Sequence, residues 1–120
     1  MRAGAAVYIA IAAAAGALPG FADTKLTPDE IKAAFFTGQA FTAATPSGVT
    51  FKMIFTADGK VVRQPSGRAG SKGEGTWQLS ADGFCTTWKK AKQNCFTLAS
   101  SGANKWSVMK GPVVIAIWSK

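Results

Sequence analysis

Short stretches of alternating apolar and polar residues, each followed by a turn, recur through the chain from residue 49 onward. In VTFKMIF (49–55), Phe51, Met53 and Phe55 fall on one side of an extended strand, while Lys52 falls on the other. A period of two is typical of β-strands. Turn sequences follow at regular intervals: ADGK (57–60), SADG (80–83), SGAN (101–104) and Gly111-Pro112. Regularly spaced short strands with such turns predict an all-β domain.

Six further segments continue the series: KVVR (60–63), TWQL (76–79), FCTTWKK (84–90), CFTLAS (95–100), KWSVMK (105–110) and VVIAIW (113–118). We expect a mainly β fold, either a small antiparallel β-barrel or a β-sandwich, with about seven or eight strands. Both architectures hide most of the strand edges. Residues 64–75, QPSGRAGSKGEG, are predicted to form one glycine-rich loop, and no segment resembles a linker between domains.

One short helix is predicted before the strands, in LTPDEIKAAFFTG (26–38). Thr27 suits the N-cap, Pro28 the first helical position, and Glu30 completes a capping box with Thr27. Ile31 and Phe35 recur at helical spacing and predict an apolar stripe, in which Ala34 also lies. Gly38 is the expected C-terminal cap. A helix this short must pack against the β-domain.

The first 22 residues have the three parts of a secretory signal. A basic start at Met1-Arg2 precedes an apolar run from Ala5 to Leu18, and small residues at Gly20 and Ala22 suit cleavage after Ala22. The apolar run has about 14 residues, fewer than the roughly 20 that span a bilayer. We therefore expect a cleaved signal peptide (1–22), no transmembrane span after cleavage, and one β-rich domain (23–120) in the periplasm or outside the cell.

Both cysteines, Cys85 and Cys95, lie on successive predicted strands. In an exported chain two cysteines indicate one disulfide, and the ten-residue separation closes a short loop worth about 2–3 kcal/mol by the chain-entropy model. The spacing is not C-x-x-C, and the chain has no histidine to complete a metal site. We predict a structural disulfide, with the tip KKAKQN (89–94) pointing into solvent.

The aromatic residues Phe51, Phe55, Trp77 and Trp88 are predicted to belong to the core, because they alternate with polar residues along their strands. The pattern does not decide between core and surface for Trp106 and Trp118. An eight-stranded barrel is just wide enough to hold one small ligand, although the same apolar side chains can simply fill its interior.

Basic residues gather in two predicted loops. The chain carries a formal net charge of +8, and removing Arg2 with the signal leaves +7. Such a balance favours anionic partners, and it also keeps a small secreted protein soluble. If the two loops share one end of the barrel, that end is strongly cationic. The candidate anion-binding residues are Arg63, Arg68, Lys72, Lys89, Lys90 and Lys92.

No catalytic arrangement is evident, and we expect no enzyme and no cofactor. The absence of histidine removes Ser-His and Cys-His pairs, and Glu74 is the one carboxylate that a turn, a helix start or the predicted mature N-terminus does not explain. The loop GRAGSKGEG is not a phosphate-binding P-loop, because Lys72 is followed by Gly73 and no strand–helix unit surrounds it. An inhibitor of lysozyme is disfavoured too, since lysozymes are typically cationic.

The chain resembles a group of small exported proteobacterial proteins, common in rhizobia and their relatives, that form a domain family of unknown function. The resemblance is carried by LTPDEIKAAFFTGQAF, FTADGK and GTWQLSADGFCTTWKKAKQNCF, which span most of the mature chain. In the last segment the order is Trp77, Asp82-Gly83, Cys85, Trp88 and Cys95-Phe96. The resemblance implies a periplasmic β-protein and no known activity.

Taken alone, the sequence favours a non-enzymatic periplasmic protein that binds an anionic envelope component or an acidic protein through its basic loops. The alternative is a carrier of a small apolar ligand inside the barrel. The two differ in the interior, since a drug-sized ligand requires a cavity of several hundred Å³.

Overall fold

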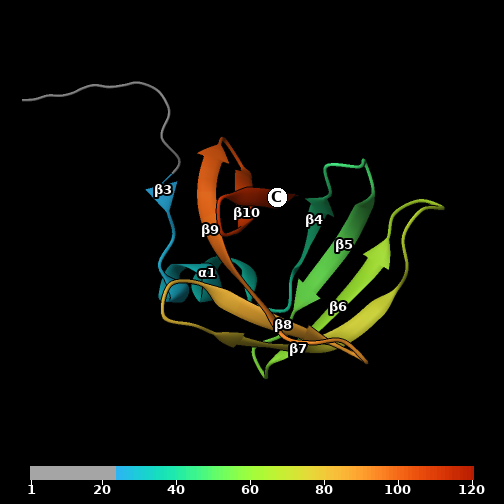
Figure 1. Cartoon of the computed structure of the whole chain (residues 1–120), viewed down its shortest axis with the longest axis horizontal. Helices are drawn as coiled ribbons and strands as arrows, with labels where there is room; N and C mark the ends of the chain where they lie inside the picture. Colours follow the sequence, from blue (N-terminus) through green and yellow to red (C-terminus); the bar gives the residue numbers. More distant parts are fainter. Residues whose placement is uncertain (1–23) are drawn as a thin grey trace, which may run out of the picture.

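Eight antiparallel strands close into a barrel in the computed structural model, which describes residues 24–120 (Figure 1). The predicted signal peptide lies outside the described residues. Closure comes from β11 pairing with β4, where Trp118 lies opposite Ala43, and from β9 pairing with β10, where Leu98 lies opposite Val108. The strands are β4 (Ala40–Ala44), β5 (Thr50–Phe55), β6 (Lys60–Pro65), β7 (Gly73–Leu79), β8 (Phe84–Trp88), β9 (Asn94–Gly102), β10 (Lys105–Lys110) and β11 (Val113–Ser119).

The prediction of a small antiparallel barrel is therefore confirmed, and the sandwich alternative is not observed. A ninth strand, β3 (Thr24–Lys25), pairs with β9 at Ser100 and Ala99. It continues the sheet beyond the part of β9 that pairs with β8, which involves residues 94–96. Within the described residues there is one helix, α1 (Pro28–Phe35), and no helix there is long and apolar enough to cross a bilayer.

Helix α1 begins as its sequence predicts. The backbone N–H of Glu30 donates to Thr27 Oγ1 at 3.2 Å, and the N–H of Thr27 donates to Glu30 Oε1 at 2.8 Å, which forms the capping box. The helix ends earlier than expected, because Phe36 rather than Gly38 is the capping residue. Gly38 instead takes a left-handed backbone, with φ +87°, and its N–H donates to the carbonyl of Phe55 at 2.8 Å.

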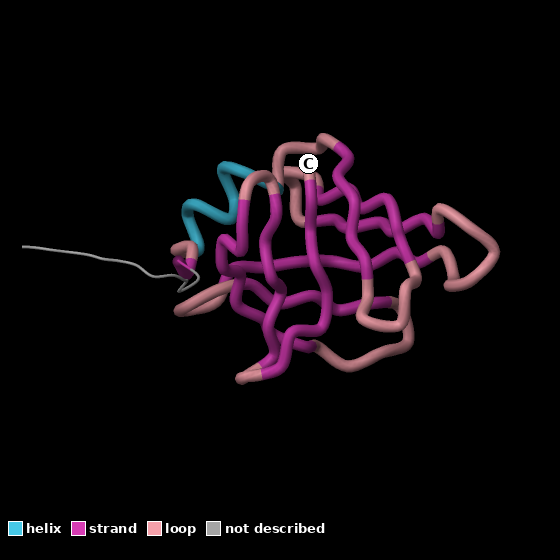
Figure 2. Tube along the Cα trace, turned by 90° about the horizontal axis from the view of Figure 1, so that it is seen from above, coloured by secondary structure: helices cyan, strands magenta, loops and turns pink. Residues whose placement is uncertain are grey.

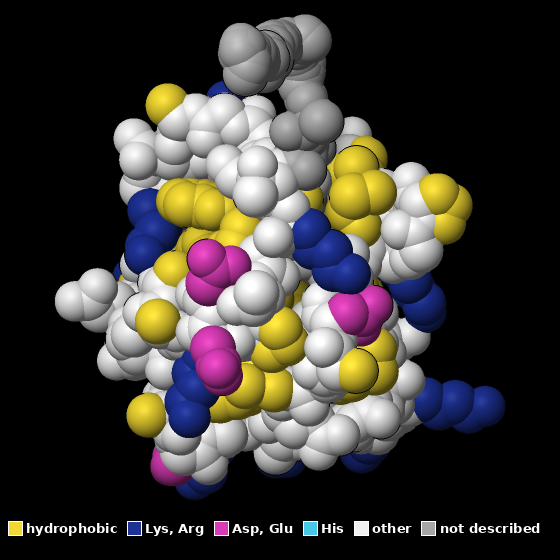
Figure 3. Space-filling view, turned by 90° about the vertical axis from the view of Figure 1, so that its left-hand side faces the viewer, with side chains coloured by type: hydrophobic (Ala, Val, Ile, Leu, Met, Phe, Trp, Pro, Cys, Tyr) yellow, Lys and Arg dark blue, Asp and Glu magenta, His cyan; other side chains and the backbone are white. Residues whose placement is uncertain are grey.

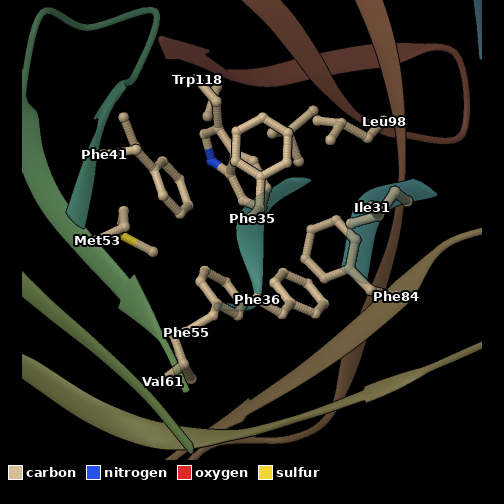
Figure 4. Close-up of a cluster of buried hydrophobic side chains, with 13 residues drawn as sticks. Ile31, Phe35, Phe36, Phe41, Met53, Phe55, Val61, Phe84, Leu98 and Trp118 are labelled. Atoms are coloured by element: carbon tan, nitrogen blue, oxygen red, sulfur yellow. The ribbon is translucent and has the colours of Figure 1, made fainter. Parts of the chain in front are cut away.

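The helix packs against one end of the barrel core (Figure 4). Ile31, Phe35 and Phe36 are all at most 2 % exposed. The ring of Phe36 stacks on that of Phe55 at a centroid distance of 4.4 Å, and Phe35 meets Trp106 edge-on at 4.9 Å. Aromatic pairs in these geometries add to the stabilisation that burial alone provides. Helix α1 therefore closes this end of the barrel, which we call the closed end.

The connections alternate between the two ends of the barrel because neighbouring strands are antiparallel. The turns at 56–59, 80–83 and 103–104 lie at the closed end with α1. The connections at 45–49, 66–72, 89–93 and 111–112 lie at the opposite end, which we call the open end. Figure 2 shows the helix on one side of the strands and long loops on the other.

Two strand predictions need correction. Strand β4 was not expected, since Ala40, Ala43 and Ala44 are weak strand formers, but it pairs with β5 and β11 and completes the barrel. The glycine-rich loop is shorter than the expected 64–75, because β6 extends to Pro65 and β7 begins at Gly73. Glycine is required within β7, where a Cβ at position 75 would lie 2.3 Å from the carbonyl oxygen of Thr87.

The disulfide joins Cys85 and Cys95 directly across β8 and β9. Cys85 is 3 % exposed, whereas Cys95 lies at the surface. The bond fixes the register of the two strands next to the loop at 89–93, whose lysines are exposed to solvent.

Candidate functional site

The two basic loops predicted from the sequence do share one end of the barrel. Arg68 and Lys72 lie in the connection at 66–72, and Arg63 lies near the end of β6 that leads into it. Lys89, Lys90 and Lys92 lie in the connection at 89–93. All six candidate residues therefore surround the open end, which the topology alone requires.

Charge is distributed unequally between the two ends among the described residues. At the open end eight basic side chains accompany one carboxylate, Glu74, which gives a net charge of +7. At the closed end five basic side chains accompany four carboxylates, which gives +1, and Figure 3 shows acidic and basic side chains interspersed on this face. The open-end cations are Lys52, Arg63, Arg68, Lys72, Lys89, Lys90, Lys92 and Lys110. The closed-end groups are Lys25, Lys32, Lys60, Lys105, Lys120, Asp29, Glu30, Asp58 and Asp82.

Three of the six candidates meet in a surface hollow. Arg63, Lys72 and Lys89 line it together with Glu74 and Trp88. Lys89 Nζ lies 3.9 Å from Glu74 Oε1, and both side chains are well exposed, at 79 % and 62 %. Such an exposed pair contributes at most about 1 kcal/mol, so it leaves Lys89 free to exchange partners. The other three candidates, in the exposed parts of the two loops, do not line this hollow.

Arg63 differs from the other cations because its position on β6 faces the barrel interior. Along β6 it alternates with the buried Val61, and across the sheet it lies opposite Met53 of β5, which is also buried. Its other cross-strand neighbour is Gly73 of β7, where an added Cβ would lie 2.9 Å from Arg63 Nε. Glycine at position 73 therefore provides the space that the inward-facing arginine occupies.

Two aromatic rings hold the Arg63 guanidinium. Its Cζ lies 4.5 Å from the centroid of the Trp88 ring and 5.3 Å from that of Phe51. These cation–π contacts stabilise the charged group, but they satisfy no hydrogen bond. The Nε of Arg63 is buried and has no hydrogen-bond partner among the described residues. A buried donor left without a partner costs about 1–3 kcal/mol, so the geometry at Arg63 is not explained by stability alone.

Beside Arg63 the barrel encloses an apolar cavity of about 140 Å³ that is partly open to solvent. Phe55 and Phe84 belong to its lining and also contact Phe36 of α1, so they separate the cavity from the helix. No residue of α1 lines it. The cavity therefore lies toward the open end. Its lining includes Phe51, Arg63, Thr86, Trp88, Phe96, Ala116 and Trp118.

The four predicted core aromatics take different positions. Phe55 is fully buried, whereas Phe51 and Trp88 are partly buried and line the cavity. Trp77 is partly buried and lies outside the cavity lining; its Nε1 donates to the carbonyl of Thr56 at 2.8 Å. Trp118, which the sequence left undecided, is 3 % exposed and faces inward.

Sequence reasoning missed two features of this region. It assigned Arg63 to a solvated loop, although alternation with Val61 in KVVR was a signal for an inward position. It also gave no role to Thr86, a 4 % exposed polar residue that lines the cavity and alternates with Phe84 and Trp88. Among residues 24–120, no group of three or more His, Cys, Asp or Glu side chains is placed to hold a metal ion.

Comparison with known proteins adds no assignment. No family model, no curated protein and no solved structure matches the chain. The proposals below are therefore supported by the geometry and charge of the open end, and by nothing transferred from a relative.

Proposed function

We propose that the protein is an exported, non-enzymatic binding protein whose open end binds an anionic, phosphate-bearing component of the cell envelope. The single observation that carries this proposal is the net charge of +7 at the open end, against +1 at the closed end. If the overall charge served solubility alone, the two ends would not need to differ in net charge. The disulfide supports an oxidising compartment, the periplasm or the exterior.

The physical basis is the kind of cation presented. Lysine ammonium groups are compact, strongly hydrated point charges that bind phosphate without fixed geometry. Several of them on two adjacent loops suit a surface or polymer that carries many phosphates. Attraction of this kind is screened over about 8–10 Å at physiological salt. We therefore expect the affinity to depend on salt but to survive moderate ionic strength when several loops engage together.

The test compares two triple variants that lower the net charge by the same amount. The first replaces Lys89, Lys90 and Lys92 at the open end with alanine. The second replaces Lys32, Lys60 and Lys105 at the closed end, which are also exposed. Binding of the disulfide-bonded protein to lipopolysaccharide is measured at low and at moderate salt. We expect the first variant to lose at least tenfold in affinity, and the second to bind like the unmodified protein.

Equal losses in both triple variants would contradict the proposal, because they would mean that only the overall charge matters. Binding that vanishes for every variant at moderate salt would do the same. Selective binding of an acidic protein, with no binding to lipopolysaccharide, would also contradict the proposal. The partner of the open end would then be a protein and not an envelope component.

The alternative function, a carrier of a small ligand, is favoured by a different observation. The interior holds a cavity, but its volume of about 140 Å³ is below the several hundred Å³ that a drug-sized ligand needs. Only a ligand with a very small apolar part fits this volume.

A further inference from the structure

We propose that the barrel cavity is a binding site for a small monocarboxylate with a single-ring apolar body, and that Arg63 is the partner of its carboxylate. This site adjoins the open-end cations at Arg63, which lines both the cavity and the outer hollow, but its occupancy does not require that those cations bind an envelope component. The inference combines three independent features of the cavity: its size, its walls and its one charged lining residue.

Size limits the apolar part of the ligand to about one ring. The cavity measures about 140 Å³. An apolar protein cavity of about 150 Å³ stays dry and accepts benzene. A six-membered ring therefore fits, whereas two fused rings or a long acyl chain do not.

The walls favour a flat apolar body. Phe51, Trp88, Phe96 and Trp118 contribute aromatic surfaces to the cavity. Offset-stacked and edge-to-face contacts with such surfaces favour another aromatic ring. Thr86 is the buried polar residue of the lining, and its hydroxyl provides one further hydrogen-bonding group.

Arg63 supplies the positive charge of the cavity lining and hydrogen-bond donors for an anion. It lies at the boundary, since it lines both the cavity and the outer hollow that contains Lys72, Glu74 and Lys89. Its guanidinium is held between the rings of Phe51 and Trp88, so its position is fixed before any ligand arrives. Its Nε is buried and has no hydrogen-bond partner among residues 24–120. The two terminal nitrogens of the guanidinium match the two oxygens of a carboxylate, which pairs with arginine through two parallel hydrogen bonds.

No described carboxylate fulfils this role from within the chain. The nearest acid along the chain is Glu74, which follows Gly73 on β7. Its side chain faces outward and pairs with Lys89 at the surface. A bound carboxylate would pair with the Arg63 guanidinium and place an attached ring in the adjoining cavity. One ligand then accounts for the cavity and for the inward-facing arginine together.

The experiment uses benzoate as the probe and benzamide as its neutral analogue of the same shape. Binding to the disulfide-bonded protein is followed by the fluorescence of the tryptophans and by the NMR cross-peak of the Arg63 Nε–H. We expect benzoate to bind and to shift that cross-peak, and benzamide to bind at least tenfold more weakly, because charge-assisted hydrogen bonds are the stronger ones.

Variants separate this site from the other open-end cations. Arg63→Met keeps the apolar stem but removes the donors, and we expect at least a tenfold loss of benzoate affinity; Arg63→Lys restores part of it. Arg68→Met removes a charge from the neighbouring loop and leaves benzoate binding unchanged. Ala116→Leu fills the cavity and blocks benzoate while retaining Arg63.

The outcomes distinguish this proposal from the one on envelope binding. The triple alanine variant at Lys89, Lys90 and Lys92 should bind benzoate normally, and Ala116→Leu, which keeps every open-end cation, should bind lipopolysaccharide normally. The proposal is overturned if benzoate fails to bind, if benzamide binds as well as benzoate, or if Arg63→Met and Ala116→Leu both bind benzoate with unchanged affinity.

Discussion

The guanidinium of Arg63 lies over the indole ring of Trp88, with 4.5 Å between Cζ and the ring centroid. The residues face the same interior from β6 and β8, on either side of β7, where glycine stands at positions 73 and 75. Large side chains at those positions would separate the two groups. The small residues of β7 therefore allow the charged group and the ring to meet beside the cavity.

Replacing Arg63 by methionine should stabilise the fold. Methionine retains an unbranched stem between Phe51 and Trp88, but it removes the buried Nε, for which the described part of the chain offers no hydrogen-bond partner. The unpaired donor costs more than the cation–π contact contributes, so the free energy of unfolding should rise by about 1 kcal/mol. Chemical denaturation measures it. Arg68→Met, in an exposed loop, should change little, and a loss of more than about 1 kcal/mol at Arg63 would contradict this account.

Gly83 should tolerate no side chain. A Cβ at this position would lie 1.9 Å from the carbonyl oxygen of Phe96, so alanine must displace backbone where β8 meets β9. We expect Gly83→Ala to lower the free energy of unfolding by about 2–3 kcal/mol. Gly67→Ala is the control, because a Cβ there meets nothing within 4 Å. Equal stability of the two variants in a thermal melt would show that Gly83 does not lie this close to the backbone of Phe96.

The disulfide should contribute a large share of the stability. Cys85 and Cys95 are directly paired across β8 and β9 and close a loop with a sequence separation of 10. The chain-entropy model gives about 3 kcal/mol for a loop of this length. We expect that loss when both are replaced by alanine, measured by urea unfolding. A loss below about 1 kcal/mol would mean that the barrel alone fixes the register.

Asp58 should titrate below its ordinary range. The hydroxyl of Thr56 donates to its carboxylate and, with a smaller contribution from Lys60, holds the pKa of Asp58 below 3.8. Because the folded pKa is the lower one, the contribution to stability is present above pH 3.8 and is lost as pH falls through the folded pKa. An NMR titration of the carboxyl carbon should show the lowered pKa, with Thr56→Val returning it toward 3.8 and Thr56→Ser preserving it. An unchanged pKa in Thr56→Val would exclude the hydroxyl as the cause.

The β-barrel could be predicted because its information is local. Alternation in VTFKMIF and the turns ADGK and SADG specify hairpins, and hairpins joined in series form an antiparallel sheet. Strand β4 escaped prediction because Ala40–Ala44 has little intrinsic preference for a strand and is held by pairing with β5 and β11. Phe36 escaped it too, since it falls beyond the helical stripe and is buried by the way α1 ends against Phe55.

The candidate site was predicted only in part. Topology brings the two basic loops to one end, and the order of the strands is enough to foresee this. The inward-facing Arg63 was missed because a charged residue is ordinarily placed in solvent. Its burial depends on Phe51, Gly73 and Trp88, which come from three other strands. The alternation of residues along a single strand cannot predict an environment that three other strands provide.

The most direct test of the account is to map which end of the barrel binds phosphate. A short soluble polyphosphate is titrated into the ¹⁵N-labelled protein, and amide NMR shifts are followed at two salt concentrations. The account predicts shifts in the open-end connections at 66–72 and 89–93, and none at the closed-end turns 56–59 and 80–83. Shifts of equal size at both ends, or larger shifts at the closed end, would contradict it.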